Sequence, residues 1–241
     1  MSLYALWRKE DIMNNLTELE GKLQFTFNDK DLLTQALVHR SYLNEHPGFK
    51  LGHNERLEFL GDAVLELVVT ENLFNNYPNP EGELTNWRAA LVNAKILADI
   101  GKELEIEEHL LLSHGESKDT SSKARHYILA DTMESIIGAM YLDKSYDEVK
   151  VFIERVVLNK LENILKNKLY LDPKSKFQES SQEFEGVTPT YKVLEESGPD
   201  HEKEFIVGVY LGSEMIAKGK GTSKQEAQVS AATEALKSKN W

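Results

Sequence analysis

The chain has 241 residues, of which 41% are hydrophobic and 28% are charged, and its formal net charge at pH 7 is −12. It contains no cysteine, which excludes disulfides, thiolate metal sites and cysteine nucleophiles. An acidic surface disfavours binding to the phosphates of a nucleic acid, although a local basic patch or a bound cation could still contact a polyanion.

The hydrophobic stretches are too short to cross a membrane, and charged residues interrupt the apolar ones near the N-terminus. We therefore expect no signal peptide, no transmembrane helix and no membrane partner, and we expect a cytoplasmic protein.

Helical spacing dominates the chain from about 16 to 169. Apolar residues recur every three or four positions there, as at Leu57, Leu60 and Val64, which is the spacing of an amphipathic helix. We expect loops where helix breakers gather, at 46–52, 77–83 and 113–126. The last of these is long and polar enough to be mobile. This part of the chain is predicted to be an all-α domain.

The segment NERLEFLGDAVLEL, at 54–67, gathers negative charge. Its acids are three or four residues apart, so a helix would stack them along one face: Glu55, Glu58, Asp62 and Glu66. Like charges at this spacing destabilise a helix by roughly 0.2–0.5 kcal/mol per pair. An ordinary amphipathic helix with an acidic solvent face is one interpretation, but it leaves unexplained why Lys and Arg are not interspersed.

A second acidic pair, Asp131 and Glu134, stands at i, i+3 opposite an apolar face, and Gly138 would leave open space one turn further along. If the two helices pack side by side, four carboxylates converge: Glu58, Asp62, Asp131 and Glu134. Such a group stays ionised only when cations neutralise it. Oxygen ligands without Cys or His favour Mg²⁺ or Mn²⁺. The two pairs therefore predict a metal centre without indicating its substrate.

After 169–175 the pattern changes. A short helix at 175–184 precedes three alternating segments that read as strands, at 190–197, 203–211 and 215–221. A final helix at 222–238 opens with a Thr-Ser cap. The order α-β-β-β-α predicts a small α+β domain. We place the domain limits at 14–145, 146–170 for a last helix and linker, and 171–241.

The segment HNERLEFLGDAVLELVVTENLF is very similar to the signature of the ribonuclease III family. FTFNDKDLLTQALVHRSY before it, and EGELTNWRAALVN, LLSHGE and ILADTMESIIGAMYLD after it, agree with that resemblance. The C-terminal unit resembles a double-stranded-RNA-binding domain, through FQESSQ, GPDHEKEF and GKGTSKQEAQVSAATEAL. The resemblance covers nearly all of the chain from about Leu16, with both domains in the bacterial order.

The resemblance implies a Mg²⁺-dependent endoribonuclease, with Mn²⁺ as a substitute ion, that hydrolyses both strands of double-stranded RNA. Its products would carry 5′-phosphate and 3′-hydroxyl ends with short 3′ overhangs, and ribosomal and messenger RNA processing would be its setting. The metal site would be Glu58, Asp62, Asp131 and Glu134. Within it, Asp62 and Glu134 would be the catalytic pair, in which Glu134 holds the ion that activates water and Asp62 orients ion and water.

Three further positions match the family. Glu55 and Glu81 stand where the family has supporting acids, although a solvated or helix-capping role fits them equally well. Phe59 stands where the family inserts an aromatic ring into the partner subunit, which implies a homodimer. A core aromatic is the alternative for Phe59.

The second domain would bind duplex RNA by its shape, through 2′-hydroxyl and phosphate contacts. By resemblance, the residues that face the grooves and phosphates are Ser175, Gln178, Glu179, His201, Ser223 and Lys224. The sequence departs from the family at Gln225 and Gln228, where the last helix usually carries lysines. We expect weaker binding and a shallower salt dependence from the lost phosphate contacts.

Two other functions stay open. A non-catalytic double-stranded-RNA-binding protein could retain this fold, and loss of any one of the four carboxylates would have favoured it. A purely structural helical dimer is the third hypothesis, but it leaves the two acidic pairs unexplained.

Overall fold

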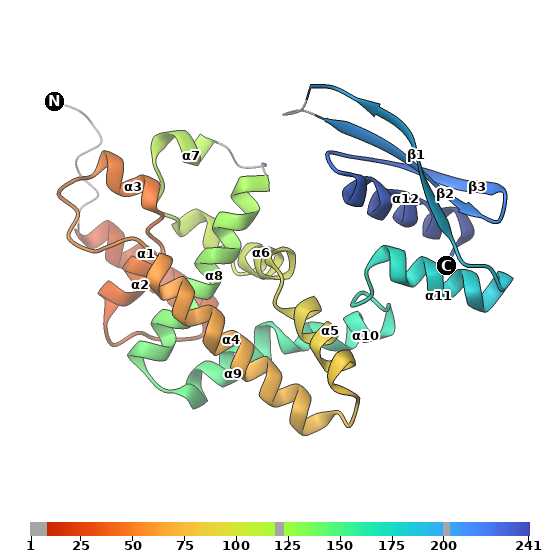
Figure 1. The fold of residues 1–241 in the computed structure, drawn as a ribbon. Coiled ribbons are helices and arrows are strands. Elements are labelled where there is room, and N and C mark those ends of the chain that lie inside the picture. Colours follow the sequence, from red (N-terminus) through yellow and green to blue (C-terminus); the bar gives the residue numbers. More distant parts are fainter. Residues whose placement is uncertain (1–8, 119–122, 200–202) are drawn as a thin grey trace. The chain divides into compact units, whose positions relative to one another are not determined.

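A computed structural model of the chain describes residues 9–118, 123–199 and 203–241, with side chains from Asn15 onward. The chain divides into two compact units, Met1–Leu165 and Lys166–Trp241 (Figure 1). No helix in the described ranges has both the length and the apolar character needed to cross a lipid bilayer.

The first unit is helical, which confirms the predicted all-α class. Its α-helices are α1 (Lys9–Leu23), α2 (Lys30–Ala36), α3 (Arg40–Glu45), α4 (Glu55–Asn76), α5 (Glu81–Leu91), α6 (Ala94–Glu103), α7 (His114–Lys118), α8 (Lys123–Asp143), α9 (Tyr146–Val156) and α10 (Leu161–Lys166). Two 3₁₀ helices, η1 (Ile106–His109) and η2 (Leu158–Lys160), complete the series.

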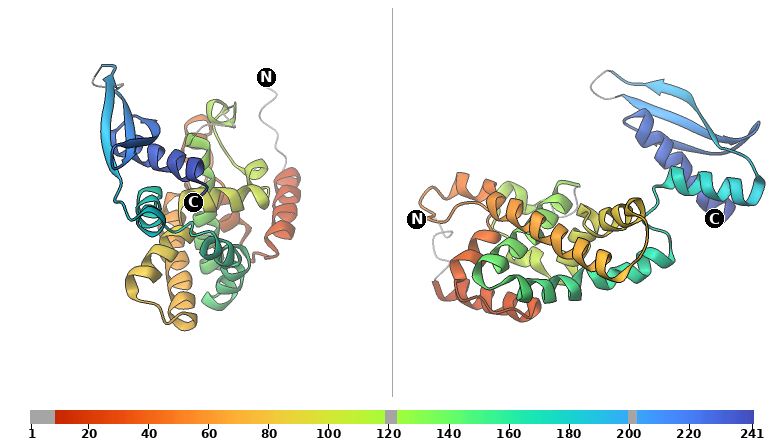
Figure 2. Two further views of the ribbon diagram at one scale, coloured as in Figure 1. Left: turned by 90° about the vertical axis from the view of Figure 1, so that its right-hand side faces the viewer. Right: turned by 60° about the horizontal axis from the view of Figure 1, so that its bottom comes forward.

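Helix α8 is the centre of this unit and packs against α2, α4, α6 and α9 (Figures 1 and 2). Its apolar side chains are buried on more than one side of the helix. The sequence suggested a single apolar face, and the structure shows that the buried surface of α8 is wider than that. Two buried hydroxyls are satisfied within the helix. Thr132 donates to the carbonyl oxygen of Ile128 at 2.7 Å, and Ser135 to that of Asp131 at 2.8 Å.

Two glycines bring the backbones of α4 and α8 together. A Cβ atom at Gly61 would lie 1.7 Å from the carbonyl oxygen of Glu134, and one at Gly138 would lie 2.2 Å from that of Leu57. No side chain larger than hydrogen fits at either position. The open space expected at Gly138 is therefore a wrong prediction, because the backbone of α4 fills it.

The loop expected at 113–126 is helical at both ends, which corrects that prediction. Helix α7 occupies His114–Lys118, and α8 already begins at Lys123. One local and one longer-range side-chain contact stabilise these helical ends. Ser113 accepts from the backbone N–H of Glu116 at 3.3 Å, and the Nε of Arg125, a buried residue, lies 2.8 Å from the Glu107 carboxylate. The remaining positions, 119–122, lie outside the described residues.

The second unit has the predicted α-β-β-β-α order: α11 (Pro173–Glu185), β1 (Thr190–Ser197), β2 (Glu204–Leu211), β3 (Glu214–Gly221) and α12 (Lys224–Lys239). The strands form one antiparallel sheet in the order β1-β2-β3. Both helices cover the same face of this sheet (Figures 1 and 2). Between them and the sheet lies a core that includes Phe177, Val209, Leu211, Ala231 and Ala235.

Side-chain caps fix where these two helices begin. The Asp172 carboxylate accepts from the backbone N–H groups of Lys174 at 3.0 Å and Ser175 at 3.2 Å, and Pro173 occupies the first helical position. Helix α11 therefore starts two residues earlier than expected. At α12, Ser223 accepts from the N–H of Glu226 at 3.1 Å, which confirms the predicted cap.

Candidate functional site

Three carboxylates from two helices converge in the first unit. Glu58 lies on α4, and Asp131 and Glu134 lie one turn apart on α8; one oxygen of each lies within 4.8 Å of the others. All three side chains are half-buried. The close approach of α4 and α8 at Gly61 and Gly138 is what allows side chains of this length to meet.

The electrostatics of this three-carboxylate cluster favour a cation. Burial, followed by the charges of the nearby acids, raises the pKa of Glu134 to about 8. Burial also raises the pKa of Glu58 and of Asp131, and the charge of Glu55 adds to both shifts. A bound cation would keep all three carboxylates ionised at neutral pH. Because every donor is an oxygen, the cluster suits a hard divalent ion.

Asp62 lies one turn after Glu58 on α4 and is exposed, so it does not belong to the group within 4.8 Å. It is nevertheless near the cluster, since its charge is the largest electrostatic contribution to the raised pKa of Glu134. An exposed side chain can change rotamer at little cost. The structure thus joins three of the four expected metal ligands and places the fourth beside them.

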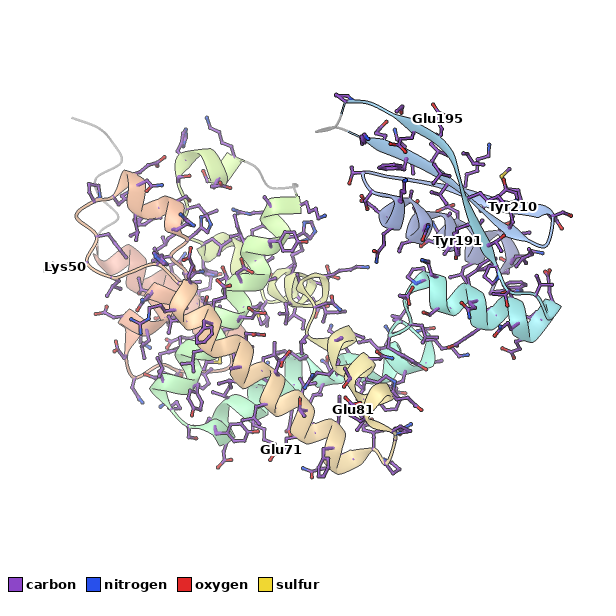
Figure 3. The ribbon with its side chains drawn as sticks, viewed as in Figure 1. Lys50, Glu71, Glu81, Tyr191, Glu195 and Tyr210 are labelled. Carbon is purple, nitrogen blue, oxygen red and sulfur yellow. The ribbon has the colours of Figure 1, made fainter. Side chains whose placement is uncertain are left out.

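The two expected supporting acids occupy different places. Glu55 stands next to the cluster, where its carboxylate lies 3.6 Å from Arg40 and 3.7 Å from the Nδ1 of His53. Glu81 is at the start of α5 (Figure 3), where its carboxylate accepts from Thr85 at 2.9 Å. This position favours a carboxylate because the N-terminus of a helix is partially positive. Within this chain, Glu81 does not join the cluster and lines a separate hollow of about 560 Å³.

Phe59 is 82% exposed, so the core alternative does not hold within this chain. Leu67 and Phe74 are exposed as well, by 56% and 76%. At 3.6 residues per turn, these three side chains fall on one side of α4. Exposed aromatic side chains on one side of a helix are a candidate protein interface.

Five of the six expected RNA-binding residues can be placed, and all five lie on the two helices of the second unit or at their starts. Ser175, Gln178 and Glu179 are exposed on α11, and the Ser175 hydroxyl donates to Asp172. Ser223 caps α12. Lys224 follows it, with its Nζ 3.9 Å from the Glu196 carboxylate. His201 lies outside the described residues.

Lys174, which sequence patterns did not single out, is also on this side of the sheet. Its Nζ donates to the Oε1 of Gln228 at 2.7 Å and lies 5.2 Å from the centre of the Tyr191 ring. The only sequence signal for it is its place directly before Ser175, in the first turn of α11.

Comparison with known proteins agrees with this geometry. The Ribonuclease-III-like family matches residues 29–161, and the double-stranded RNA binding motif matches 173–239. Ribonuclease 3 of a Nitratiruptor species is 42% identical over 226 residues, covering 93% of this chain and 97% of the relative. Ribonuclease 3 of Enterococcus faecalis is 42% identical over 224 residues, covering 92% and 96%.

Solved structures give the same result for the first unit. Two structures of the nuclease domain of ribonuclease III from Campylobacter jejuni match with 41% identity and TM-scores of 0.54 and 0.55. They cover 60% and 61% of this chain, and 96% and 97% of their own. One of them was described for structural flexibility in the region involved in dimer formation. The chain therefore belongs to the ribonuclease III family of endoribonucleases, with a helical nuclease-type domain followed by a double-stranded-RNA-binding motif.

Proposed function

We propose that this chain is a Mg²⁺-dependent endoribonuclease that hydrolyses both strands of double-stranded RNA. Its products would have 5′-phosphate and 3′-hydroxyl ends with short 3′ overhangs, and its substrates would be ribosomal and messenger RNA precursors in the cytoplasm. The observation that carries the proposal is the convergence of Glu58, Asp131 and Glu134 in a chain that also contains a double-stranded RNA binding motif. We assign catalysis to 14–145, a last helix and linker to 146–170, and RNA binding to 171–241.

The four acids would have distinct roles. Glu58, Asp131 and Glu134 would hold the ion through one oxygen each, and Glu134 would stand beside the attacking water. Asp62 is exposed and close to Glu134, so it would orient that water and complete the ligand set. When bound, a divalent ion lowers the pKa of water and stabilises negative charge on a phosphoryl oxygen. Glu55 would tune the cluster through its charge.

The proposed assembly is a homodimer. The exposed ring of Phe59 supports it, because an aromatic side chain in water gains free energy when a partner covers it. The described dimer formation of the nuclease domain from Campylobacter jejuni also supports it. A two-fold axis would place two copies of the cluster against opposite strands of one duplex. Glu81, which stands apart from the cluster of its own chain, would act from this position as a supporting acid.

The second unit would bind the duplex by shape. Ser175, Gln178 and Glu179 would face one minor groove, and His201 would face another. Ser223 and Lys224 would meet phosphates at the N-terminus of α12, where backbone N–H groups also point at an anion. Gln225 and Gln228 carry no charge, so we expect binding weaker than in lysine-rich relatives.

The test is cleavage of a labelled RNA duplex by the full chain with Mg²⁺, with Mn²⁺, and with a chelator. Both strands should be cut with either ion, to products with 5′-phosphates, and the matching single strand should not be cut. A duplex that is bound but left intact with both ions would instead support a non-catalytic RNA-binding protein.

A further inference from the structure

The first turn of α11 holds a lysine whose ammonium group has two defined contacts. Lys174 is half-buried, and its Nζ has two neutral partners, the Oε1 of Gln228 at 2.7 Å and the face of the Tyr191 ring at 5.2 Å. Gln228 lies on α12, one turn after Lys224. This hydrogen bond therefore holds the positive charge of a residue on α11 next to the first turns of α12.

The Tyr191 ring is a fixed platform for this charge. It packs against both parts of the core of the second unit, and burial raises the pKa of its hydroxyl to about 12, with a further contribution from Asp172. Figure 3 labels Tyr191 on β1, on the sheet beside the two helices. A cation held over a packed ring loses less side-chain freedom when it binds an anion than a solvated lysine does.

Lys174 and Lys224 also differ in their acidic neighbours. Among the described residues, Lys174 makes no ion pair, and its charge interacts with that of Asp172, which caps the same helix. Lys224 lies 3.9 Å from Glu196, a carboxylate that also accepts from Lys203 at 3.1 Å. An ammonium group has three N–H donors, so after its bond to Gln228 Lys174 retains donors for a phosphate.

We propose that Lys174 is a phosphate-binding residue of the RNA-binding domain, positioned by Gln228 and the Tyr191 ring beside the start of α12. The proposal rests on the proposed binding of duplex RNA and deepens it. Gln228 is then a positioning residue, because its carbonyl oxygen holds the ammonium where a lysine at 228 would repel it. Lys174 on α11 would thus supply a positive charge near the positions on α12 where this chain has Gln225 and Gln228 instead of lysines.

The domain provides a matched control. Lys192 lies 4.9 Å above the Tyr210 ring, in the same kind of contact. Because successive residues of a strand point to opposite faces, Lys192 stands on the face of the sheet away from Tyr191 and the helices. Lys192→Gln removes the same charge and the same type of ring contact from the other face.

The experiment is fluorescence anisotropy of a labelled RNA duplex with the full chain, in a chelator to prevent cleavage, over a range of salt concentrations. Lys174→Gln should weaken binding severalfold and reduce the slope of log Kd against log salt by roughly one unit. Between about 50 and 200 mM salt, the factor by which its Kd rises should therefore be roughly fourfold smaller than the factor for the wild type. Lys192→Gln should keep the wild-type slope.

A double variant, Lys174→Gln with Gln228→Lys, exchanges the donor and acceptor of the bond and should regain the wild-type slope. Circular dichroism of each variant should show the same α+β signal. Lys174→Gln with the wild-type slope would overturn the proposal, and so would an equal loss in Lys192→Gln, which would indicate a net-charge effect. A wild type that does not bind the duplex at all would overturn the proposed function itself.

Discussion

Replacing Gly61 with alanine would insert a methyl group into the contact between α4 and α8. The new Cβ would lie 1.7 Å from the carbonyl oxygen of Glu134, 2.6 Å from its carbonyl carbon and 2.9 Å from the backbone nitrogen of Gly138. All three are backbone atoms, so no rotamer change can relieve the clash. Ordinary contact begins near 3.4 Å, and the helices would have to separate by about 1.7 Å locally.

Overpacking of a core costs about 1–3 kcal/mol, occasionally more, and we expect Gly61→Ala to lie at the upper end because its neighbours are rigid. For a unit of this size, a loss of that order lowers Tm by roughly 6–12 °C. The separation would also move Glu58 away from Asp131 and Glu134 by nearly the length of a Mg²⁺–oxygen bond, about 2.0–2.1 Å. Affinity for a divalent ion should therefore fall with stability.

The assay combines thermal unfolding, followed by circular dichroism in a chelator, with calorimetric titration of Mn²⁺. Gly21→Ala is the matched control, since Gly21 is exposed on α1 and nothing lies within 4 Å of its added Cβ. Alanine is favoured over glycine inside a helix, so this control should gain about 0.5–1 kcal/mol. Wild-type Tm and Mn²⁺ affinity in Gly61→Ala would refute the close approach of the two helices as the basis of the cluster.

Three further predictions concern the dimer, pH and RNA binding. Phe59→Ala should raise the dimer dissociation constant at least tenfold per ring lost from the interface, whereas Val151→Ala, on an exposed part of α9, should leave it unchanged. If sedimentation gives Phe59→Ala the same mass as the wild type at every concentration, the ring does not lie in a dimer interface. Burial lowers the pKa of His109 below 6.5, so the folded state favours the neutral imidazole, and the stability that this contributes is lost as pH falls below that value. His109→Asn should therefore flatten the decline of Tm below about pH 6.5. An unchanged decline would exclude His109 as its source. Glu196→Gln removes the ion pair between Glu196 and Lys224 and should tighten duplex binding by up to about fivefold. Weaker binding of the variant in fluorescence anisotropy would show that Glu196 does not compete with RNA for Lys224.

Local patterns explain what the sequence predicts well. The α-β-β-β-α order and the Ser223 cap depend on alternation and spacing over a few residues, and the structure has both. The acidic pairs are local too, since i, i+3 and i, i+4 spacing fixes a common helix face. Glu58 and Glu134 could therefore be assigned to one site as soon as their helices were assumed to be neighbours.

Long-range contacts explain what the sequence could not predict. Gly61 and Gly138 read as glycines within helices, but the carbonyl oxygens that they face belong to another helix and cannot be read from spacing. For the same reason the sequence suggested space at Gly138. The helical ends within 113–126 depend partly on the ion pair between the buried Arg125 and the half-buried Glu107, which are 18 residues apart. The bond between Lys174 and Gln228 joins two helices separated by a whole sheet in sequence.

The central claim is that the three-carboxylate cluster is the catalytic metal site for RNA cleavage, and Glu134→Gln tests this claim most directly. The full chain and this variant should be compared for cleavage of a labelled duplex with Mg²⁺ and for binding of the same duplex in a chelator. Glu162→Gln, which removes an exposed acid on α10, is the matched control. We expect Glu134→Gln to bind like the wild type and to leave the duplex uncut, while Glu162→Gln cuts normally. Cleavage by Glu134→Gln at the wild-type rate would contradict the assignment of the cluster as the catalytic site.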